Sequence, residues 1–185
     1  MGRTAKFSEE MIVRTAISEI ANNRPSGIQD IAAACDASIG SMYHRFPSHH
    51  ALRASAWIAV VRAFHSEFLR DLTAAKTIGQ GAEAALVVVR WSRSNLDAAN
   101  ILIRHRQQDF ISSNTPEPER SSAKNLNEEM AKAMRAFARK VDRSSLRCSY
   151  ALIGSPYGAV RLSLPAPPPA ALDNLVRAAY FAIME

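Results

Sequence analysis

The sequence has few of the features that mark secreted, disulfide-bonded or membrane proteins. It contains two cysteines, Cys35 and Cys148, whose spacing fits neither a zinc motif nor a disulfide framework. The apolar runs, such as residues 84–89, are far below the ~18 residues that a membrane span needs. Residues 1–11 contain no apolar stretch like that of a signal peptide. We therefore expect a cytoplasmic protein in a reducing compartment, with no membrane partner.

Strand patterns and internal repeats are missing as well. No segment alternates apolar and polar residues over the length of a β-strand. Hydrophobic residues make up 48% of the 185 residues, which is enough to bury a core in one or two small domains. The sequence therefore predicts an all-α fold.

The net charge of +6 is weak evidence for nucleic-acid binding, because residues 1–50 carry five basic and five acidic side chains. The distribution is more informative than the total. The acids Glu9, Glu10 and Glu19 belong to a first predicted helix, whereas residues 38–45 carry no acid. The segment without acids is the part of the chain best suited to approach a phosphate backbone.

Residues 28–46 have the pattern of a helix-turn-helix. Ile28, Ile31 and Ala32 lie on one face of a first short helix, and Met42 and Phe46 repeat that spacing in a second. The segment 36–38 breaks the two helices apart, over the length of a tight turn. In such a unit the second helix can enter the major groove of DNA.

Local signals set the ends of the helices around this unit. Ser8, Ser38 and Ser48 are at positions where a hydroxyl can cap a helix, and Ser26 with Gln29 matches a capping box. Phe7 and Ile12 occupy the two positions of a hydrophobic staple. Residues 49–72 contain no glycine or proline and predict one long helix of ~36 Å that joins the head to the rest.

The stretch SIGSMYHRFPSHHAL, residues 38–52, resembles the signature of the TetR family of transcriptional regulators. The positions that match this signature are Ser38, Gly40, Met42, Tyr43, Phe46, Ser48, Ala51 and Leu52. The chain departs from the signature at the turn glycine, which is Asp36, and at the turn valine, which is Ala37. It also has Ile39 and the pair His49-His50 where the family often has lysine and Lys-Glu. Asp tolerates a left-handed turn position, so we expect the turn to form.

Downstream of residue 72 the sequence predicts helices only. We expect them over 81–94, 97–110, 119–141, 144–164 and 170–184, with a kink at Gly154-Ser155-Pro156 in the fourth. This half resembles the TetR-family body, in which the last two helices of each subunit form a dimer interface. The resemblance implies a DNA-binding domain at 1–50, with its helix-turn-helix at 27–46, and a ligand-binding and dimerisation domain at 51–185.

The resemblance also assigns candidate site residues. It implies that DNA is contacted by Gln29, Ser38, Ile39, Gly40, Ser41, Tyr43, His44 and His49. Large side chains on helices that we expect to surround a cavity are ligand candidates, and many of these will be plain core: Trp57, Phe64, Trp91, His105, Phe110 and Tyr150. The apolar faces of the last two helices predict the dimer contacts Leu152, Tyr157, Leu162, Leu172, Leu175, Val176 and Ala179.

Metal and catalytic sites are not expected. His44, His49 and His50 fall on different helix faces across a Pro-Ser junction, which does not suit a metal site even with Cys35 nearby. No phosphate loop, nucleophile elbow or cofactor motif accompanies the polar residues around Arg104-His105-Arg106. We expect a homodimeric repressor that binds a palindromic DNA operator and is released by a small, largely apolar effector. The alternative is a helical small-molecule-binding or interaction protein whose head no longer binds DNA.

Overall fold

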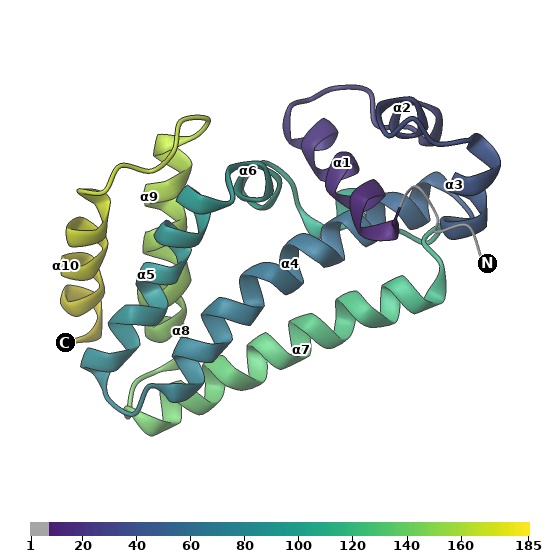
Figure 1. Cartoon of the computed structure of the whole chain (residues 1–185). Coiled ribbons are helices and arrows are strands. Elements are labelled where there is room, and N and C mark those ends of the chain that lie inside the picture. Colours follow the sequence, from purple (N-terminus) through teal and green to yellow (C-terminus); the bar gives the residue numbers. More distant parts are fainter. Residues whose placement is uncertain (1–7) are drawn as a thin grey trace, which may run out of the picture.

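The computed structural model describes residues 8–185, and over this range the chain forms helices and no strand. Three short helices form a head: α1 (Glu9–Ala21), α2 (Ile28–Ala34) and α3 (Ile39–Arg45). The long α4 (His49–Ala74) leaves the head and crosses the molecule (Figure 1). The prediction of an all-α protein with an N-terminal head joined to a helical body is therefore confirmed.

The body is built around α4. The helix α5 (Ile78–Ser94) packs on one side of α4, and α7 (Glu117–Lys140) runs along the other (Figure 1). Between them in sequence come α6 (Leu96–Arg104), which touches α1 and α4, and a 3-10 turn, η1 (Gln107–Asp109). The last helices, α8 (Ser145–Ser149), α9 (Ser155–Ser163) and α10 (Leu172–Met184), lie at the end opposite the head. None of the helices formed by residues 8–185 is long and apolar enough to span a membrane.

Hydroxyl caps begin the helices of the head as the sequence predicts. The Ser38 and Ser48 hydroxyls accept from the backbone N–H groups of Ser41 and Ala51 at 3.2 and 3.1 Å. The capping box of α2 is shifted by one residue from our prediction of Ser26 and Gln29. Gly27 is the N-cap, and the Asp30 carboxylate accepts its N–H at 2.9 Å. The Phe7–Ile12 staple lies outside the described residues, because Phe7 is not among them.

Three helices end without glycine. Asn23, Asp36 and Asp142 follow α1, α2 and α7 and adopt positive φ values of 54°, 53° and 51°. Each is followed by an N–H that bonds back to a carbonyl five residues earlier, as Ala37 does to Ala32 at 2.8 Å, which is a Schellman ending. The expectation that Asp36 replaces the turn glycine is confirmed, because the short polar side chain tolerates this backbone region.

Two predicted helices of the body are interrupted. The helix that we expected over 97–110 ends at Arg104, His105 is extended, and the Asp109 carboxylate accepts the Arg106 N–H at 2.7 Å to start η1. The helix expected over 144–164 contains a π turn, η2 (Tyr150–Gly154), instead of a break. Ser155 donates its N–H to the Tyr150 carbonyl five residues back. Pro156 has no N–H to donate to the Leu152 carbonyl. The α-helical pattern of hydrogen bonds between residues four apart therefore changes at this point to bonds between residues five apart.

One glycine is required by packing in the body. A Cβ on Gly81 would overlap the hydroxyl of Tyr180 and the edge of the Phe137 ring. Both side chains are fully buried, and the Tyr180 hydroxyl donates to the Ile78 carbonyl at 2.8 Å. Gly81 thus lets α5 approach α10 closely and leaves room for the Phe137 ring of α7, and α10 is held in place from within the subunit.

Candidate nucleic-acid interface and ligand cavity

The helix α3 has one buried face and one exposed face. Met42 and Phe46 are buried and fix the helix on the head. Ile39 is 41% exposed and Tyr43 is 52% exposed, and both lie on the free side. Gly40 is also exposed, and nothing lies within 4 Å of the position where its Cβ would be. This face presents backbone, an apolar side chain and a phenol without an acidic group, which suits a DNA groove.

The predicted DNA-contacting residues lie on α2, on α3 with its N-cap Ser38, and at the start of α4. Seven of them are exposed and Ser41 is half-buried. Gln29 and Ser38 stand at the N-terminal ends of α2 and α3, and His49 opens α4. Backbone N–H groups and side chains at such helix starts are able to contact a phosphate.

The arginines of the head have partners inside the chain. Arg24 forms a bidentate pair with Glu19, with distances of 2.7 and 2.8 Å. Arg45 folds back on its own helix, donating to the Ser41 carbonyl at 3.0 Å and to the Ser41 hydroxyl at 2.5 Å. In the described part of the head, Arg24 and Arg45 are thus engaged within the chain, and the predicted DNA-facing positions carry mainly hydroxyl, amide and imidazole groups.

His49 is tied to the connector between α1 and α2. Its Nε2 lies 3.2 Å from the Ser26 carbonyl, so this nitrogen carries the proton and donates. Burial, and then the nearby Arg53 charge, lower the pKa of His49. The neutral ring leaves Nδ1 as an acceptor only, so His49 can donate to a phosphate through Nδ1 only after it is protonated.

The six aromatic and histidine ligand candidates do not form one site. The Trp57 ring stacks on the Phe110 ring, with the ring centroids 5.0 Å apart. The His105 ring meets the Phe110 ring edge-on, with a centroid distance of 5.5 Å, beside η1. Phe64 and Trp91 form a second cluster, in which the two rings meet edge-on with their centroids 5.4 Å apart. Tyr150 belongs to neither cluster and is 60% exposed. The six candidates thus fall into two separate ring clusters and one exposed tyrosine, and Phe110 lies beside Trp57 after α6 has ended at Arg104.

A small cavity of about 70 Å³ lies next to the second cluster. Phe64 and Trp91 line it, together with residues that the sequence did not single out for this role: Val88, Ser92, Ala99, Leu102, Ile103 and Ile153. Tyr157, which we predicted as a dimer contact, lines the same cavity, and its hydroxyl donates to the Ile103 carbonyl at 3.0 Å. The spacing of Val88, Trp91 and Ser92 along α5 was the available signal, because it places them on one face.

A surface groove of about 370 Å³ runs between α7 and the π turn. It is lined by Met130, Met134, Ser149, Tyr150, Ile153 and Gly154. Ile153 therefore belongs to both hollows. A larger cleft of about 750 Å³ lies between α1 and the start of α6, and Ile17 is among its lining residues. That cleft is more polar, with Arg14, Glu19 and Asp97 among its lining residues.

The predicted dimer residues divide into an outer and an inner set. Leu162 on α9 and Leu175 on α10 are 91% and 66% exposed, and Leu172 and Ala179 are half-buried. Leu152 and Val176 are fully buried in the subunit's own core, so in this structure they cannot be reached by a second chain. Phe181 is exposed on α10, and Gly158 leaves open space on α9, although neither was predicted. Figure 1 shows α9 and α10 side by side, at the end far from the head.

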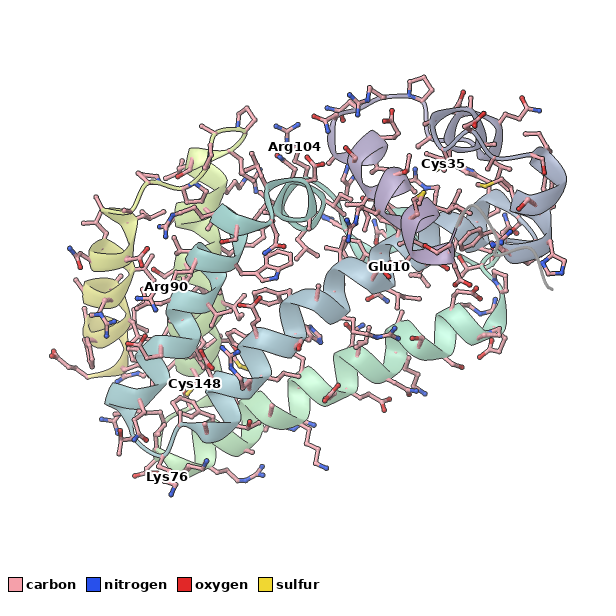
Figure 2. The ribbon with its side chains drawn as sticks, in the orientation of Figure 1. Glu10, Cys35, Lys76, Arg90, Arg104 and Cys148 are labelled. Carbon is pink, nitrogen blue, oxygen red and sulfur yellow. The ribbon has the colours of Figure 1, made fainter. Side chains whose placement is uncertain are left out.

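Ion pairs hold α10 against α5. Asp173 accepts from Arg93 at 2.7 Å and from Arg90 at 2.8 Å, and Glu83 accepts from Arg177 at 2.7 Å. Figure 2 labels Arg90 on α5, on the side that faces α10. Hydrogen bonds from Arg177 lower the pKa of Glu83. Burial raises the pKa of Asp173, but the bonds from Arg93 and Arg90 outweigh burial and lower it.

Comparisons with known proteins support the fold. No protein-family model matches the chain, and no curated protein matches it in sequence. A solved structure described as the fatty acid degradation regulator FadR from Bacillus halodurans is similar, with a TM-score of 0.66 and 13% sequence identity. The match covers 96% of this chain and 98% of that protein. At this identity the likeness shows that the fold, from the head to the last helix, is shared.

Proposed function

We propose that the chain is a DNA-binding transcriptional regulator of the TetR type, which acts in the cytoplasm as a homodimer. The observation that carries this proposal is the free face of α3, where Ile39, Gly40 and Tyr43 are exposed and no acid is present. The shared fold with a protein named as a regulator supports it. In this proposal Ile39, Gly40 and Ser41 face base edges, while Gln29, Tyr43, His44 and His49 contact phosphates.

A second copy of the chain gives the regulator two reading heads. The exposed Leu162, Leu175 and Phe181 form an apolar surface that a two-fold partner would bury. The operator would then be palindromic, with half-sites in successive major grooves. We expect Leu162→Arg to convert the dimer to a monomer in analytical ultracentrifugation, whereas Met11→Arg on α1 should leave the sedimentation coefficient unchanged. A dimer that survives Leu162→Arg would place the interface elsewhere.

Release from DNA is proposed to depend on a small, largely apolar effector in the body. The effector would bind best to a conformer in which α4 has swung, so that the two α3 helices no longer match successive grooves. Effector and operator would then weaken each other's binding by the same factor. The regulator would thus be a ligand-relieved repressor.

The first test is to select bound duplexes from a random pool and to sequence them. A palindromic motif is expected, and Tyr43→Ala should weaken binding to every duplex by about tenfold, the value of one hydrogen bond to a charged group. Leu146→Ala removes a large exposed side chain from the body and is the control. Full affinity in Tyr43→Ala would refute the phosphate contact.

A second candidate function is a helical ligand-binding protein whose head has lost DNA binding. The pairing of Arg24 with Glu19 and of Arg45 with Ser41 favours it, because these cations are engaged within the head. Salt dependence separates the two functions: each neutralised phosphate contributes a slope of about −0.9 to log K against log salt concentration. No enriched motif at low salt and pH 6 would favour this second function.

A further inference from the structure

We propose that Ile153 is a gate between the surface groove and the small cavity, and that the two hollows together bind an unbranched apolar chain. This inference rests on the proposed effector-binding role of the body and names the class of effector. Its basis is that Ile153 is half-buried and lines both hollows. Rotation of this one side chain would join them.

The cavity alone is too small for an effector. Its volume of about 70 Å³ is less than half of the ~150 Å³ of an engineered cavity that accepts benzene. It can accept the end of a narrow chain, but an organic molecule of any size must continue beyond it. The groove, at about 370 Å³, provides the needed space on the other side of Ile153.

The chemistry of the cavity selects an apolar chain end. Its walls include Phe64 and Trp91. The two hydroxyl groups that border it already donate to backbone carbonyls, Ser92 to Val88 at 2.7 Å and Tyr157 to Ile103 at 3.0 Å. A ligand acceptor placed beside these hydroxyls would lose its water without gaining a hydrogen bond from either of them. The polar end of the effector must therefore stay in the groove, toward solvent.

The groove is adaptable where the chain would enter. Met130 and Met134 form its α7 wall, and methionine side chains can repack around ligands of different shape. Its opposite wall is the π turn Tyr150–Gly154, which carries Ile153. A Cβ on Gly154 would lie 3.3 Å from the Tyr150 ring, so the glycine lets this ring lie close to the backbone. A single π turn within an α-helix is a frequent feature of functional sites, and here it places the gate in the least regular part of the helix.

Fluorescence of Trp91 is the direct assay, because this side chain lines the cavity. The variant Trp57→Phe removes the other tryptophan, which stacks on Phe110 outside the cavity. The probes are straight-chain alkanoates and alkanols of increasing length, used below their micelle concentrations. We expect a saturable change in Trp91 emission and an affinity that rises about fourfold per methylene until the two hollows are filled. Both head groups should give the same slope, and a branched chain end should bind about tenfold more weakly.

Substitutions of Ile153 test the gate in the Trp57→Phe background. We expect Ile153→Phe to weaken chain binding by about tenfold or more, because the larger side chain fills the passage. Ile153→Ala should speed association and admit branched chain ends, so the two variants act in opposite directions. Ile17→Phe is the matched control, since it makes the same change at a half-buried isoleucine in the larger cleft beside α1. Thermal unfolding of each variant shows that it is folded.

Three results would overturn the gate. These are an affinity unchanged by Ile153→Phe, an affinity lost with Ile17→Phe instead, and no Trp91 response to any chain. If one of these results is found and the same preparation still selects a palindromic duplex, the regulator proposal stands and only the chain-ligand proposal has failed. Loss of chain binding and of duplex selection together, in a folded protein, would overturn both.

Discussion

Gly81 provides the sharpest test of how the body is packed. We expect Gly81→Ala to destabilise the protein although alanine is the better helix former by about 1 kcal/mol. The added methyl would overlap the Tyr180 hydroxyl and the edge of the Phe137 ring. Neither side chain can move into solvent, because Tyr180 and Phe137 are 0% and 1% exposed. The α5 helix must therefore move, or the core must repack.

The magnitude follows from two losses. Overpacking of a core by one methyl group costs about 1–3 kcal/mol. Displacement of the Tyr180 hydroxyl breaks its 2.8 Å bond to the Ile78 carbonyl, and a buried polar group left without a partner costs about 1–3 kcal/mol. After the gain in helix propensity, the free energy of unfolding should fall by about 3 kcal/mol. For a chain of this length the melting temperature should fall by about 6–12 °C.

Circular dichroism at 222 nm during heating measures this change, and two variants control for it. Gly79→Ala, two residues earlier in α5, has only the Thr77 hydroxyl near its new Cβ, at 3.9 Å, and should leave stability unchanged or raise it by up to about 1 kcal/mol. Phe137→Leu combined with Gly81→Ala should cost less than the sum of the two single changes, because the smaller side chain makes room. A melting temperature of Gly81→Ala equal to that of the native chain would refute the packing argument.

Three further outcomes are expected. Ser38→Ala removes the hydroxyl that accepts the Ser41 N–H at 3.2 Å and should cost about 1 kcal/mol of stability by denaturant unfolding, whereas Ser41→Ala keeps that cap. The pKa values of Glu83 and Asp173 are lower in the folded chain than in the unfolded one. Their ion pairs therefore stabilise the protein at a pH above the ordinary carboxyl pKa, and this stabilisation is lost as the pH falls through the lowered pKa of the folded state. Unfolding at pH 3 to 7 should show that Asp173→Asn removes part of this dependence. DNA affinity should rise from pH 8 to pH 5.5 as His49 gains its Nδ1 proton, and His49→Gln should flatten the profile.

Features set by neighbours in sequence were predictable. The caps at Ser8, Ser38 and Ser48 depend on a hydroxyl and an N–H three residues later, so the residue type was enough. The left-handed Asp36 followed from its short side chain. The start of α2 was misplaced by one residue because Ser26 and Asp30 offer two competing caps, and the carboxylate of Asp30 accepts the Gly27 N–H.

Features set by contacts across the fold were not predictable. The apolar period along the last helices gave no way to separate Leu152 and Val176, which are buried, from Leu162 and Leu175, which are exposed. The cavity was missed in part because Ile103 and Ile153 are ordinary apolar residues until α6 and the π turn bring them together. The helix predicted over 97–110 gave no sign that α6 ends at Arg104, and this ending places Phe110 beside Trp57.

The two buried thiols allow the stability of the two halves of the chain to be measured separately. Cys35 lies in the head and Cys148 lies in the body, at distant places in Figure 2. Burial raises the pKa of Cys148, which further slows its reaction in the folded state. Each thiol reacts with a maleimide only when its own surroundings open, so the two labelling rates report two local unfolding free energies. Faster labelling of Cys35 than of Cys148 would mean that the head opens while the body stays folded.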